Sequence, residues 1–414
     1  MSGQDTIAVI GAGVIGTAVT HALAREGRKV VLIDRAAPGV AGASFGNAGH
    51  IATELVQPLP APGLLFGFWR QLFRFGGALD LPPAQIVHMA PWIRRFASSA
   101  FRQAENTVHL APLVLPAAAA WSRWLEEIGR SELLRRHGHY EIGLGRGGRA
   151  LMDAQALAIT RLGIRVESVP VERLLPLQGA AGAGSISGLW FEDSAHVVDP
   201  LRVVQALAVA AMARNVTLRQ DEVRALRPLG DRIEVLGDHG TLTVEAAVVC
   251  TGMGSQPLLA SFGLHCPLQA VRGYHVEIQG HAPFLDAPVV YTQKHIVVTP
   301  MAGRLRASSY MEFAADRAPP DPRKPARLRR LLRELGYDCE PEGSNWVGAR
   351  PVLPDYLPGI GRAPGPSKLF YAVGHQHIGV TLAPITAELV TDLVAERAAR
   401  LPVAAFDLRR FGAS

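Results

Sequence analysis

The segment Thr6–Arg35, TIAVIGAGVIGTAVTHALAREGRKVVLIDR, decides the fold. Its apolar run Ile7–Ile10 is typical of a buried parallel strand. The next residues predict a helix from about Val14 to Glu26, which stops at Gly27, and KVVLID then returns as a second strand. The segment therefore predicts a β-α-β unit at the start of an α/β fold.

Three glycines lie at the turn between the first strand and the helix. Gly11, Gly13 and Gly16 follow the G-x-G-x-x-G pattern, which allows a tight turn, close approach of the backbone to a pyrophosphate, and close packing of helix on strand. Together with Val14 and Ile15 they are predicted to contact a dinucleotide cofactor. The glycine pattern alone is weak evidence, but here strand, helix and second strand surround it in the required order.

Asp34 ends the second strand, eighteen residues after Gly16. A carboxylate at this position accepts hydrogen bonds from the adenosine ribose hydroxyls. It would repel a 2′-phosphate, so the sequence disfavours NADP despite the adjacent Arg35. Both Asp34 and Arg35 are predicted cofactor contacts.

The loop after the second strand favours FAD over a nicotinamide cofactor. GASFGNAGHIATE, residues 42–54, is rich in small residues, and such a loop can lie flat against a long cofactor. Ser44 and Asn47 offer hydrogen bonds, and Gly46 and Gly49 allow close approach. Ser44, Asn47, Ala48 and Gly49 are predicted cofactor contacts. An ordinary glycine loop is the alternative.

A second indication of FAD lies downstream. Residues 199–218 predict an amphipathic helix and a strand, and residues 232–252 predict a hairpin with its turn at Gly237–Gly240 and a buried strand ending at Thr251 and Gly252. A β-meander that includes Val223 and precedes the last parallel strand suits a flavin domain. Val223, Thr251 and Gly252 are therefore predicted cofactor contacts.

The ordered motifs SFGNAGHI, VVCTGMGS, WVGARPVLPDYLPGIGR and GHQHIGVTLAP resemble those of the D-amino-acid oxidase superfamily of FAD enzymes. The chain looks most like the bacterial D-amino-acid dehydrogenase and D-hydroxyproline dehydrogenase branch, over essentially its full length. The resemblance implies non-covalent FAD. It also implies a Rossmann-like α/β cofactor domain with a parallel sheet and β-meander, beside an α+β substrate domain with a mainly antiparallel sheet. We expect the cofactor domain at residues 1–63, 195–264 and 346–414, and the substrate domain at 64–194 and 265–345.

Arg350 is the single cation of the proline-stiffened segment GARPVLPD. An arginine fork matches a carboxylate bidentately, and the resemblance implies that Arg350 clamps the substrate carboxylate, with a structural salt bridge as the alternative. Tyr274 and Tyr310 are candidates to close over the substrate, although either could be structural. His50, directly after the NAG loop, is expected at the flavin edge.

The late segment VGHQHIGVTLAP, residues 373–384, is predicted to be a loop that feeds a helix N-terminus, with Pro384 in the first turn. That helix end suits the negative charge that develops on a reduced flavin. The predicted cofactor contacts are Gly374, His375, Ile378 and Gly379. A metal site is not predicted, because His375 and His377 lack further ligands nearby. His377 replaces an arginine of glycine oxidases, and the resemblance points to D-hydroxyproline and D-proline as substrates.

The bulk composition excludes several other classes of protein. The chain has 414 residues, 48% of them hydrophobic, and a net charge of +6, but its arginines are spread out, which disfavours nucleic-acid binding. Three unpaired cysteines and the start of the chain indicate a cytoplasmic protein. The apolar segment LLFGFWRQLFRF, residues 64–75, is predicted to be a helix with Arg70 and Arg74 on one side. It would either pack on its own domain or dock on the membrane face, where a quinone could accept electrons.

These patterns predict an enzyme that dehydrogenates the CH–NH or CH–NH2 group of a D-amino acid, with hydride transfer to flavin N5 and a quinone or other carrier as acceptor. A same-fold oxidase acting on a D-amino acid, glycine or sarcosine with O2 is the first alternative. A flavin-binding subunit of a larger complex is the second, and a nicotinamide dehydrogenase is the third. The sequence leaves the oligomeric state open.

Overall fold

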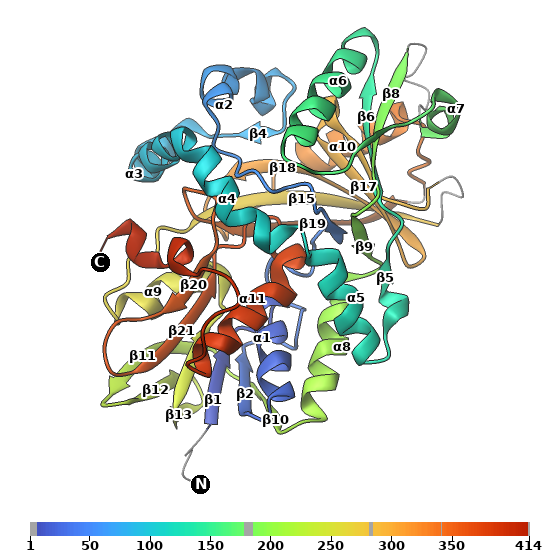
Figure 1. Ribbon diagram of the computed structural model, residues 1–414. Helices are drawn as coiled ribbons and strands as arrows, with labels where there is room; N and C mark the ends of the chain where they lie inside the picture. Colours follow the sequence, from blue (N-terminus) through green and yellow to red (C-terminus); the bar gives the residue numbers. More distant parts are fainter. Residues whose placement is uncertain (1–5, 178–184, 281–284, 341, 413–414) are drawn as a thin grey trace.

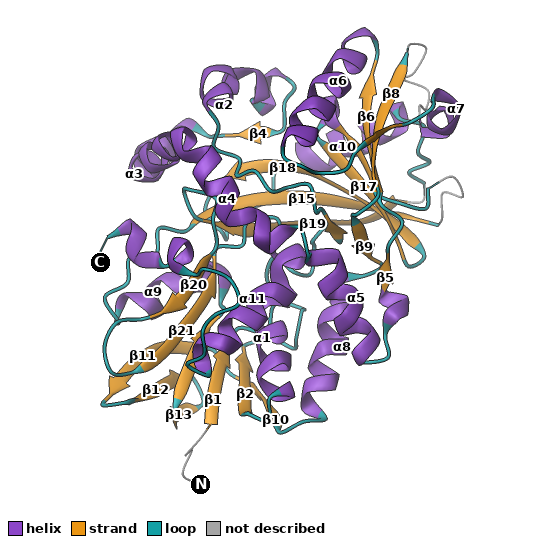
Figure 2. Ribbon diagram, viewed as in Figure 1, coloured by secondary structure: helices purple, strands orange, loops and turns teal. Residues whose placement is uncertain are grey.

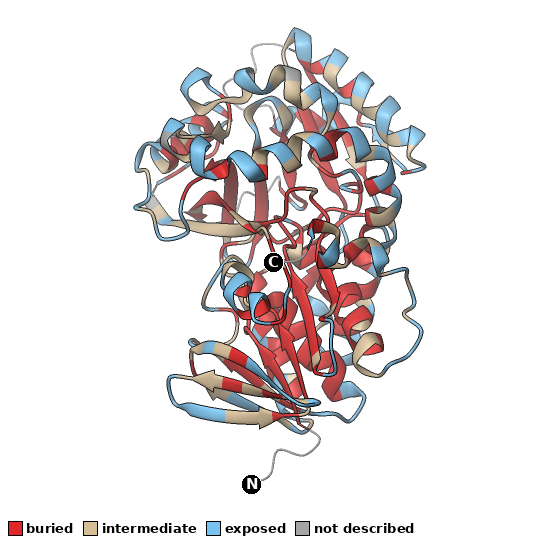
Figure 3. Cartoon of the chain, turned by 90° about the vertical axis from the view of Figure 1, so that its left-hand side faces the viewer, coloured by how far each residue is buried: buried red, intermediate tan, exposed pale blue. Residues whose placement is uncertain are grey.

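The computed structural model describes residues 6–177, 185–280, 285–340 and 342–412. A mainly parallel sheet forms the lower half of the molecule in Figure 1, and a larger, mainly antiparallel sheet crosses above it. Buried residues concentrate in both sheets and in the helices packed on them (Figure 3). The predicted fold class, which combines a parallel with an antiparallel sheet, is confirmed.

The lower sheet is built around the opening β-α-β unit. Its strand order is β10-β2-β1-β14-β21-β20, and only β20 runs antiparallel to its neighbour. Every residue of β1 is buried, because helices or strands cover both faces, as the apolar run predicts. The bounds are Thr6–Ile10 (β1), Lys29–Asp34 (β2), Val216–Gln220 (β10), Ala246–Val249 (β14), Gly359–Arg362 (β20) and Lys368–Val373 (β21).

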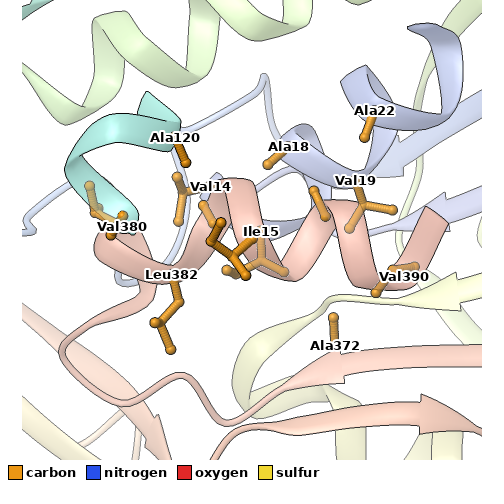
Figure 4. Close-up of a cluster of buried hydrophobic side chains, with 14 of the residues drawn as sticks. Val14, Ile15, Ala18, Val19, Ala22, Ala120, Ala372, Val380, Leu382 and Val390 are labelled. Carbon is orange, nitrogen blue, oxygen red and sulfur yellow. The ribbon is translucent and has the colours of Figure 1, made fainter. Parts of the chain in front are cut away.

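Three helices cover one face of this sheet: α1 (Val14–Arg25), α8 (Pro200–Met212) and α11 (Gly379–Val394) (Figure 2). A fourth, α5 (Ala117–Glu127), packs on α11. Figure 4 shows α1 and α11 in close contact through small and branched side chains. Ala18 and Ala22 of α1 are buried there, and small side chains let two helices approach closely. This packing holds the N-terminal ends of both helices beside the same edge of the sheet.

The predicted meander covers the other face. Strands β11 (Val223–Leu229), β12 (Arg232–Gly237) and β13 (Gly240–Val244) form a three-stranded sheet, and the pairing of Gly237 with Gly240 confirms the predicted hairpin turn. The meander packs with the short helix α9 (Ser255–Ala260) on buried residues of β1 and β14.

The upper sheet has the order β19-β15-β18-β17-β16-β6-β8-β7, with β4 paired to β18. Strand β19 crosses the predicted domain boundary at residues 345 and 346, and the division into domains stays a prediction. The strands are Leu79–Asp80 (β4), His139–Leu144 (β6), Glu167–Ser168 (β7), Ile186–Phe191 (β8), Gln269–Gln279 (β15), Val289–Tyr291 (β16), Ile296–Met301 (β17), Arg304–Phe313 (β18) and Glu342–Val352 (β19).

The remaining elements surround or connect the two halves. A small sheet joins β3 (His50–Ile51), β9 (Ala195–Val197) and β5 (Leu134–Arg135). The other helices are Pro83–Ser99 (α3), Gln103–Val114 (α4), Arg146–Arg161 (α6), Val171–Leu174 (α7) and Arg323–Glu334 (α10). No helix in the described ranges is both long and apolar enough to cross a bilayer.

The predicted helix over residues 64–75 is wrong. The chain forms α2 (Pro62–Gly67) and two short 3-10 turns, Phe68–Gln71 and Phe73–Phe75, because Leu72 adopts an extended backbone with ψ 137°. Arg74 lies over the ring of Phe75, and the side chain of Arg70 lies outside the described residues. Trp69 and Phe75 are exposed, while docking on a membrane stays a prediction.

Pro384 lies in the second turn of α11 and not, as predicted, in the first, because the helix already begins at Gly379. A proline there has no N–H for the carbonyl of Val380, four residues earlier. The indole Nε1 of Trp121 donates to that carbonyl instead, at 2.8 Å. A side chain of α5 thus satisfies the backbone group that the proline frees.

Candidate active site

A cavity of about 630 Å³ opens where the carboxyl ends of β1, β2, β14 and β21 meet β19. Its volume lies within the ~300–1,000 Å³ usual for small-molecule sites, and ligands of open α/β sheets bind at this edge. Fourteen predicted cofactor residues line it: Gly11, Gly13, Val14, Ile15, Asp34, Arg35, Ser44, Asn47, Val223, Thr251, Gly252, Gly374, His375 and Gly379. Four do not: Gly16, Ala48, Gly49 and Ile378. The cofactor-binding roles of all eighteen residues stay predictions.

The first glycines are required by close backbone packing. Gly11 has φ 101°, and a Cβ there would lie 2.6 Å from the carbonyl oxygen of Cys250. A Cβ on Gly16 would lie 1.8 Å from the carbonyl oxygen of Gly11. Gly16 therefore lets the helix pack on the turn, and the turn leaves the backbone of Gly11 and Gly13 facing the cavity.

The carboxylate of Asp34 fixes the turn from the neighbouring strand. Its Oδ2 accepts from the amide of Ala12 at 2.6 Å, and its Oδ1 accepts from the amide of Ala36 at 3.0 Å. Arg35 lies 3.9 Å from Glu222, which also lines the cavity. Carboxylate oxygens have more than one acceptor site each, so Asp34 can accept a ribose hydroxyl as well.

The loop after β2 is held from both sides. Ser44 Oγ accepts from the amide of Val14 at 3.0 Å, and Asn47 donates to the carbonyl of His377 at 3.3 Å, which links this loop to the late one. On its other side the buried Arg306 donates to the carbonyls of Phe45 and Asn47 at 3.2 and 2.6 Å. The antiparallel sheet thus positions the cofactor loop.

Glycine is also required at the centre of that loop. A Cβ on Gly46 would lie 2.2 Å from the ring of Trp346, which stacks on His275 with ring centroids 5.2 Å apart. His275 Nδ1 lies 3.0 Å from the carbonyl of Gly46. Trp346 also lines the cavity, so it forms a wall against the loop.

The late loop closes against the segment after β19. Gly374 has φ 71°, and a Cβ there would lie 2.6 Å from Leu353. His375 is buried, its Nε2 lies 3.1 Å from Thr386 Oγ1, and burial lowers its pKa to about 3. It is therefore a neutral, packed imidazole beside the cavity. The α11 N-terminus at Gly379 and Val380 lines the same space, as predicted from the sequence.

Arg350 lies beside the cavity, between the lining residues Ala349 and Pro351. Its guanidinium crosses the strand pair over Gly273, where a Cβ would lie 2.1 Å from Nη2. Nη1 donates to the carbonyl of Tyr310 at 2.9 Å. Burial lowers the pKa of Arg350 from its usual range, and arginine stays charged nonetheless. Within the described residues Arg350 forms no ion pair with a carboxylate, in contrast to the structural salt bridge that was the alternative.

The two predicted tyrosines differ. Tyr310 is buried at φ 70°, and its Oη has no hydrogen-bond partner within the described residues. Tyr274 Oη donates to Glu312 at 2.9 Å and accepts from Arg272 at 2.9 Å and from the amide of Asp321 at 3.0 Å. Tyr310 therefore retains a hydroxyl for a ligand, whereas Tyr274 belongs to a buried ion cluster.

Sequence reasoning missed Tyr356, which lies in the motif LPDYLPGIGR. It is buried at φ 57°, with no hydrogen-bond partner for its Oη in the described parts of the chain. The side-chain amide of Gln376 donates to its carbonyl, and Tyr356 and Arg350 influence each other's pKa. The positive φ that singles it out, uncommon for a bulky residue, is visible only in the structure.

The two other predicted histidines lie outside the cavity lining. The side chain of His377 has exposed surface. Desolvation by the surrounding protein, and to a smaller extent the charge of Arg350, lowers the pKa of His377 to about 4. Its ring is therefore neutral at pH 7. His50 packs edge-on against His139, with ring centroids 4.5 Å apart. Burial, and then the charge of His139, lowers the pKa of His50 well below its usual range.

The cavity has further lining residues that the sequence did not indicate: Asp221, Glu222, Met253, Asp316, Arg317, Trp346 and Gln376. Most follow the ends of strands that only the sheet topology brings together. The lining as a whole fits FAD, because glycine turns at two helix N-termini present backbone amides. An acidic residue lies at the ribose position, and small residues leave room for a flat ring.

Comparisons with known proteins agree with this geometry. A family model described as FAD dependent oxidoreductase (DAO) matches residues 6–393. A D-amino-acid oxidase of Bradyrhizobium diazoefficiens is 29% identical over 415 residues, 98% of each chain. D-amino acid dehydrogenase 2 of Ralstonia nicotianae is 29% identical over 433 residues, which cover 98% of this chain and 100% of that protein. Glycine oxidase from Geobacillus kaustophilus has a TM-score of 0.77 at 23% identity over 99% of both chains, a likeness of fold.

Proposed function

The chain belongs to the DAO family of FAD-dependent oxidoreductases, and on this premise we propose that it dehydrogenates D-amino acids, with D-hydroxyproline or D-proline as the best substrates. FAD is its cofactor. When bound, FAD supplies the acceptor for the hydride that leaves Cα as the C=N bond of the imino acid forms. We further propose that a quinone or another carrier, rather than O2, accepts the electrons.

The observation that carries the proposal is the placement of Arg350. Its guanidinium is held by the carbonyl of Tyr310, and although Arg350 itself lies outside the cavity lining, its neighbours Ala349 and Pro351 in β19 line the cofactor space. A planar cation in such surroundings suits the carboxylate of an amino acid. Since one guanidinium amine is bound to Tyr310, the remaining donors are left for the substrate.

Two tyrosines complete the proposed carboxylate site. Tyr310 and Tyr356 each have a buried hydroxyl without a protein partner in the described ranges, and buried hydroxyls normally have one. We propose that a substrate carboxylate bound by Arg350 accepts from Tyr356, which interacts electrostatically with that cation, and that Tyr310 closes over the substrate. Tyr274 is proposed to act one step removed, because its ring lies edge-on to Tyr310 at 6.1 Å.

His377 supports a cyclic amino acid as the substrate. It is neutral at pH 7, so it adds no second cation for a carboxylate, and the loop form GHQHIG resembles that of enzymes that act on D-hydroxyproline. A neutral imidazole can donate to the hydroxyl of the ring or line its apolar side. The substrate amine has to be neutral when the Cα–H leaves, so activity should rise with pH.

The decisive experiment mixes the FAD-loaded protein anaerobically with a panel of D-amino acids and their L-isomers. Loss of the oxidised flavin absorbance with D-proline or cis-4-hydroxy-D-proline, but not with the L-isomers, supports the proposal. Turnover with a redox dye and no peroxide in air supports a dehydrogenase, whereas stoichiometric peroxide indicates an oxidase. Failure of every D-amino acid to reduce the flavin contradicts the proposed function.

A further inference from the structure

A group of donor atoms lies outside the lining of the cofactor cavity, where the small sheet meets the antiparallel one. His50 in β3, Glu54 just after it and His139 at the start of β6 each offer a ligand atom, and these atoms all lie within 4.8 Å of one another. None of the three lines the cavity. Glu141, also in β6, approaches the group with its Oε1 3.9 Å from His139 Nε2.

The ring nitrogens of the group have unused hydrogen-bonding capacity. Neither nitrogen of the fully buried His139 has a hydrogen-bond partner in the described part of the chain, and the same is true of His50 Nε2. Buried polar atoms without partners are uncommon in native proteins. His139 Nε2 lies 3.5 Å from Glu54 Oε1, which is longer than a strong ionic hydrogen bond.

That spacing fits a shared metal ion. Donor atoms in a tetrahedral shell at about 2.0–2.1 Å from zinc lie about 3.3–3.4 Å from one another. The separation of His139 Nε2 and Glu54 Oε1 is close to that edge length. The ligand atoms of His50, Glu54 and His139 all lie within 4.8 Å of one another, so only small side-chain movements would bring them around a common centre.

The local charge also favours a cation. Glu54 and Glu141 are both buried. The Nε2 of His139 lies 3.5 Å from Glu54 Oε1 and 3.9 Å from Glu141 Oε1. Two buried carboxylates thus approach the same imidazole. A divalent cation would neutralise both carboxylates.

The surroundings of the ligands resemble the outer shell of a metal site. Ser194 Oγ donates to Glu54 Oε2 at 3.0 Å, and the side-chain amide of Gln155 donates to Glu141 Oε2. Each carboxylate therefore has one oxygen fixed by a neighbour and the other directed at His139. The His139 ring stacks on Phe191 with centroids 4.5 Å apart. Such outer contacts fix the orientation of metal ligands.

We propose that His50, Glu54 and His139 bind a divalent transition-metal ion, zinc in the first instance, with Glu141 as the fourth ligand. Two imidazoles and two carboxylates suit zinc. The ion would be structural, because it would join β3 to β6 across the boundary between the two halves of the molecule. His50, which keeps some exposed surface, would be the side from which the ion enters.

The test uses the FAD-loaded full chain, purified without a metal-affinity tag. The metal content is measured by mass spectrometry, and zinc binding to the chelator-treated protein is followed by titration and by thermal unfolding. We expect about one ion per chain at a four-ligand site of this kind, and a Tm that falls with chelator and recovers with zinc. X-ray absorption should show nitrogen and oxygen ligands at about 2.0–2.1 Å and no sulfur at about 2.3 Å.

Three variants locate the site. His139→Asn should abolish stoichiometric binding, and Ser194→Ala, which removes only an outer contact, should weaken it by about 10-fold to 100-fold. The matched control is His21→Asn, because His21 is also buried, lies in α1 away from the group, and has two ring nitrogens without partners in the described residues. It should bind zinc like the wild type.

Several outcomes would overturn the proposal. The first is a wild-type chain with no saturable zinc binding, which is expected if a water molecule fills the group. The second is an absorption spectrum with sulfur ligands, and the third is unchanged zinc binding in His139→Asn. If His139→Asn fails to fold, the absorption spectrum of the wild type and the affinity of Ser194→Ala decide. None of these readouts depends on enzyme activity, so the metal proposal and the proposed function fail separately.

Discussion

Replacing Gly273 by alanine should move Arg350 without altering Arg350 itself. The new Cβ would lie 2.1 Å from Nη2 and 2.4 Å from Cζ of the guanidinium. Non-bonded carbon atoms settle at about 3.5–4.0 Å, so the guanidinium has to shift by about 1 Å or more. The obstacle is the end of a flexible side chain, and the pairing of β15 with β19 should therefore survive.

The size of the effect follows from the contact that is lost. A hydrogen bond to a charged group contributes about 1.5–3 kcal/mol, which corresponds to about a 10-fold to 150-fold decrease in kcat/KM if the whole contact is lost. Arg350→Ala should approach the upper end of this range. Gly273→Ala should lie near tenfold, because the displaced cation remains close to the carboxylate.

Steady-state kinetics with the best D-amino acid and a redox dye measure the change, with FAD content and Tm measured beside it. The control is Gly147→Ala, since a Cβ on Gly147 meets nothing within 4 Å. Normal kcat/KM in a folded, FAD-loaded Gly273→Ala variant would show that Arg350 does not hold the substrate. Loss of FAD with normal affinity for substrate would place Arg350 at the cofactor instead.

Three other changes test the packing around the cofactor and the response to pH. Trp121→Phe should lower the free energy of unfolding in urea by about 1–3 kcal/mol, because the carbonyl freed by Pro384 loses its donor. Adding Pro384→Ala should recover part of the loss, since the new N–H can reach that carbonyl. A double variant with no recovery would contradict this account. Gly16→Ala should lose FAD, measured by absorbance after gel filtration, because its Cβ would lie 1.8 Å from the carbonyl oxygen of Gly11; full FAD content would refute the need for close packing. Burial lowers the pKa of His21 to about 4. Between about pH 6.5 and pH 4 the unfolded chain therefore binds a proton that the folded chain does not. The free energy of unfolding should decrease as the pH is lowered through this range, by up to about 1.4 kcal/mol per pH unit. His21→Phe should flatten that slope in unfolding experiments, and an unchanged slope would show that His21 is protonated when folded.

The opening β-α-β unit could be read from the sequence because its signals are local. The apolar strand and the G-x-G-x-x-G turn each depend on neighbours within a few residues, and the helix ends at Arg25, one residue before the predicted end. The hairpin at Gly237–Gly240 was predictable for the same reason. Fourteen predicted cofactor residues line one cavity, because strand ends that follow this pattern meet at one edge of the sheet.

Other features could not be read locally. Pro384 was placed in the first turn because the sequence does not show that Trp121, far away in the chain, supplies the donor that a proline in the second turn requires. Residues 64–75 have the composition of an apolar helix, yet the extended backbone at Leu72 breaks it. Tyr274 and Tyr310 look alike in sequence, and only their neighbours in space distinguish a bonded hydroxyl from an unpartnered one in the described residues.

The sequence by itself determined the cofactor class and the strand–helix order at the start of the chain, since glycine positions, hydrophobic periods and charge act over short stretches. The tertiary structure decided which buried polar groups have partners, because each hydrogen bond depends on a residue that may lie hundreds of positions away. Asn47 shows this: its backbone carbonyl accepts from Arg306, and its side-chain amide donates to the carbonyl of His377. The grouping of His50, Glu54 and His139 likewise arises only when the two sheets pack together.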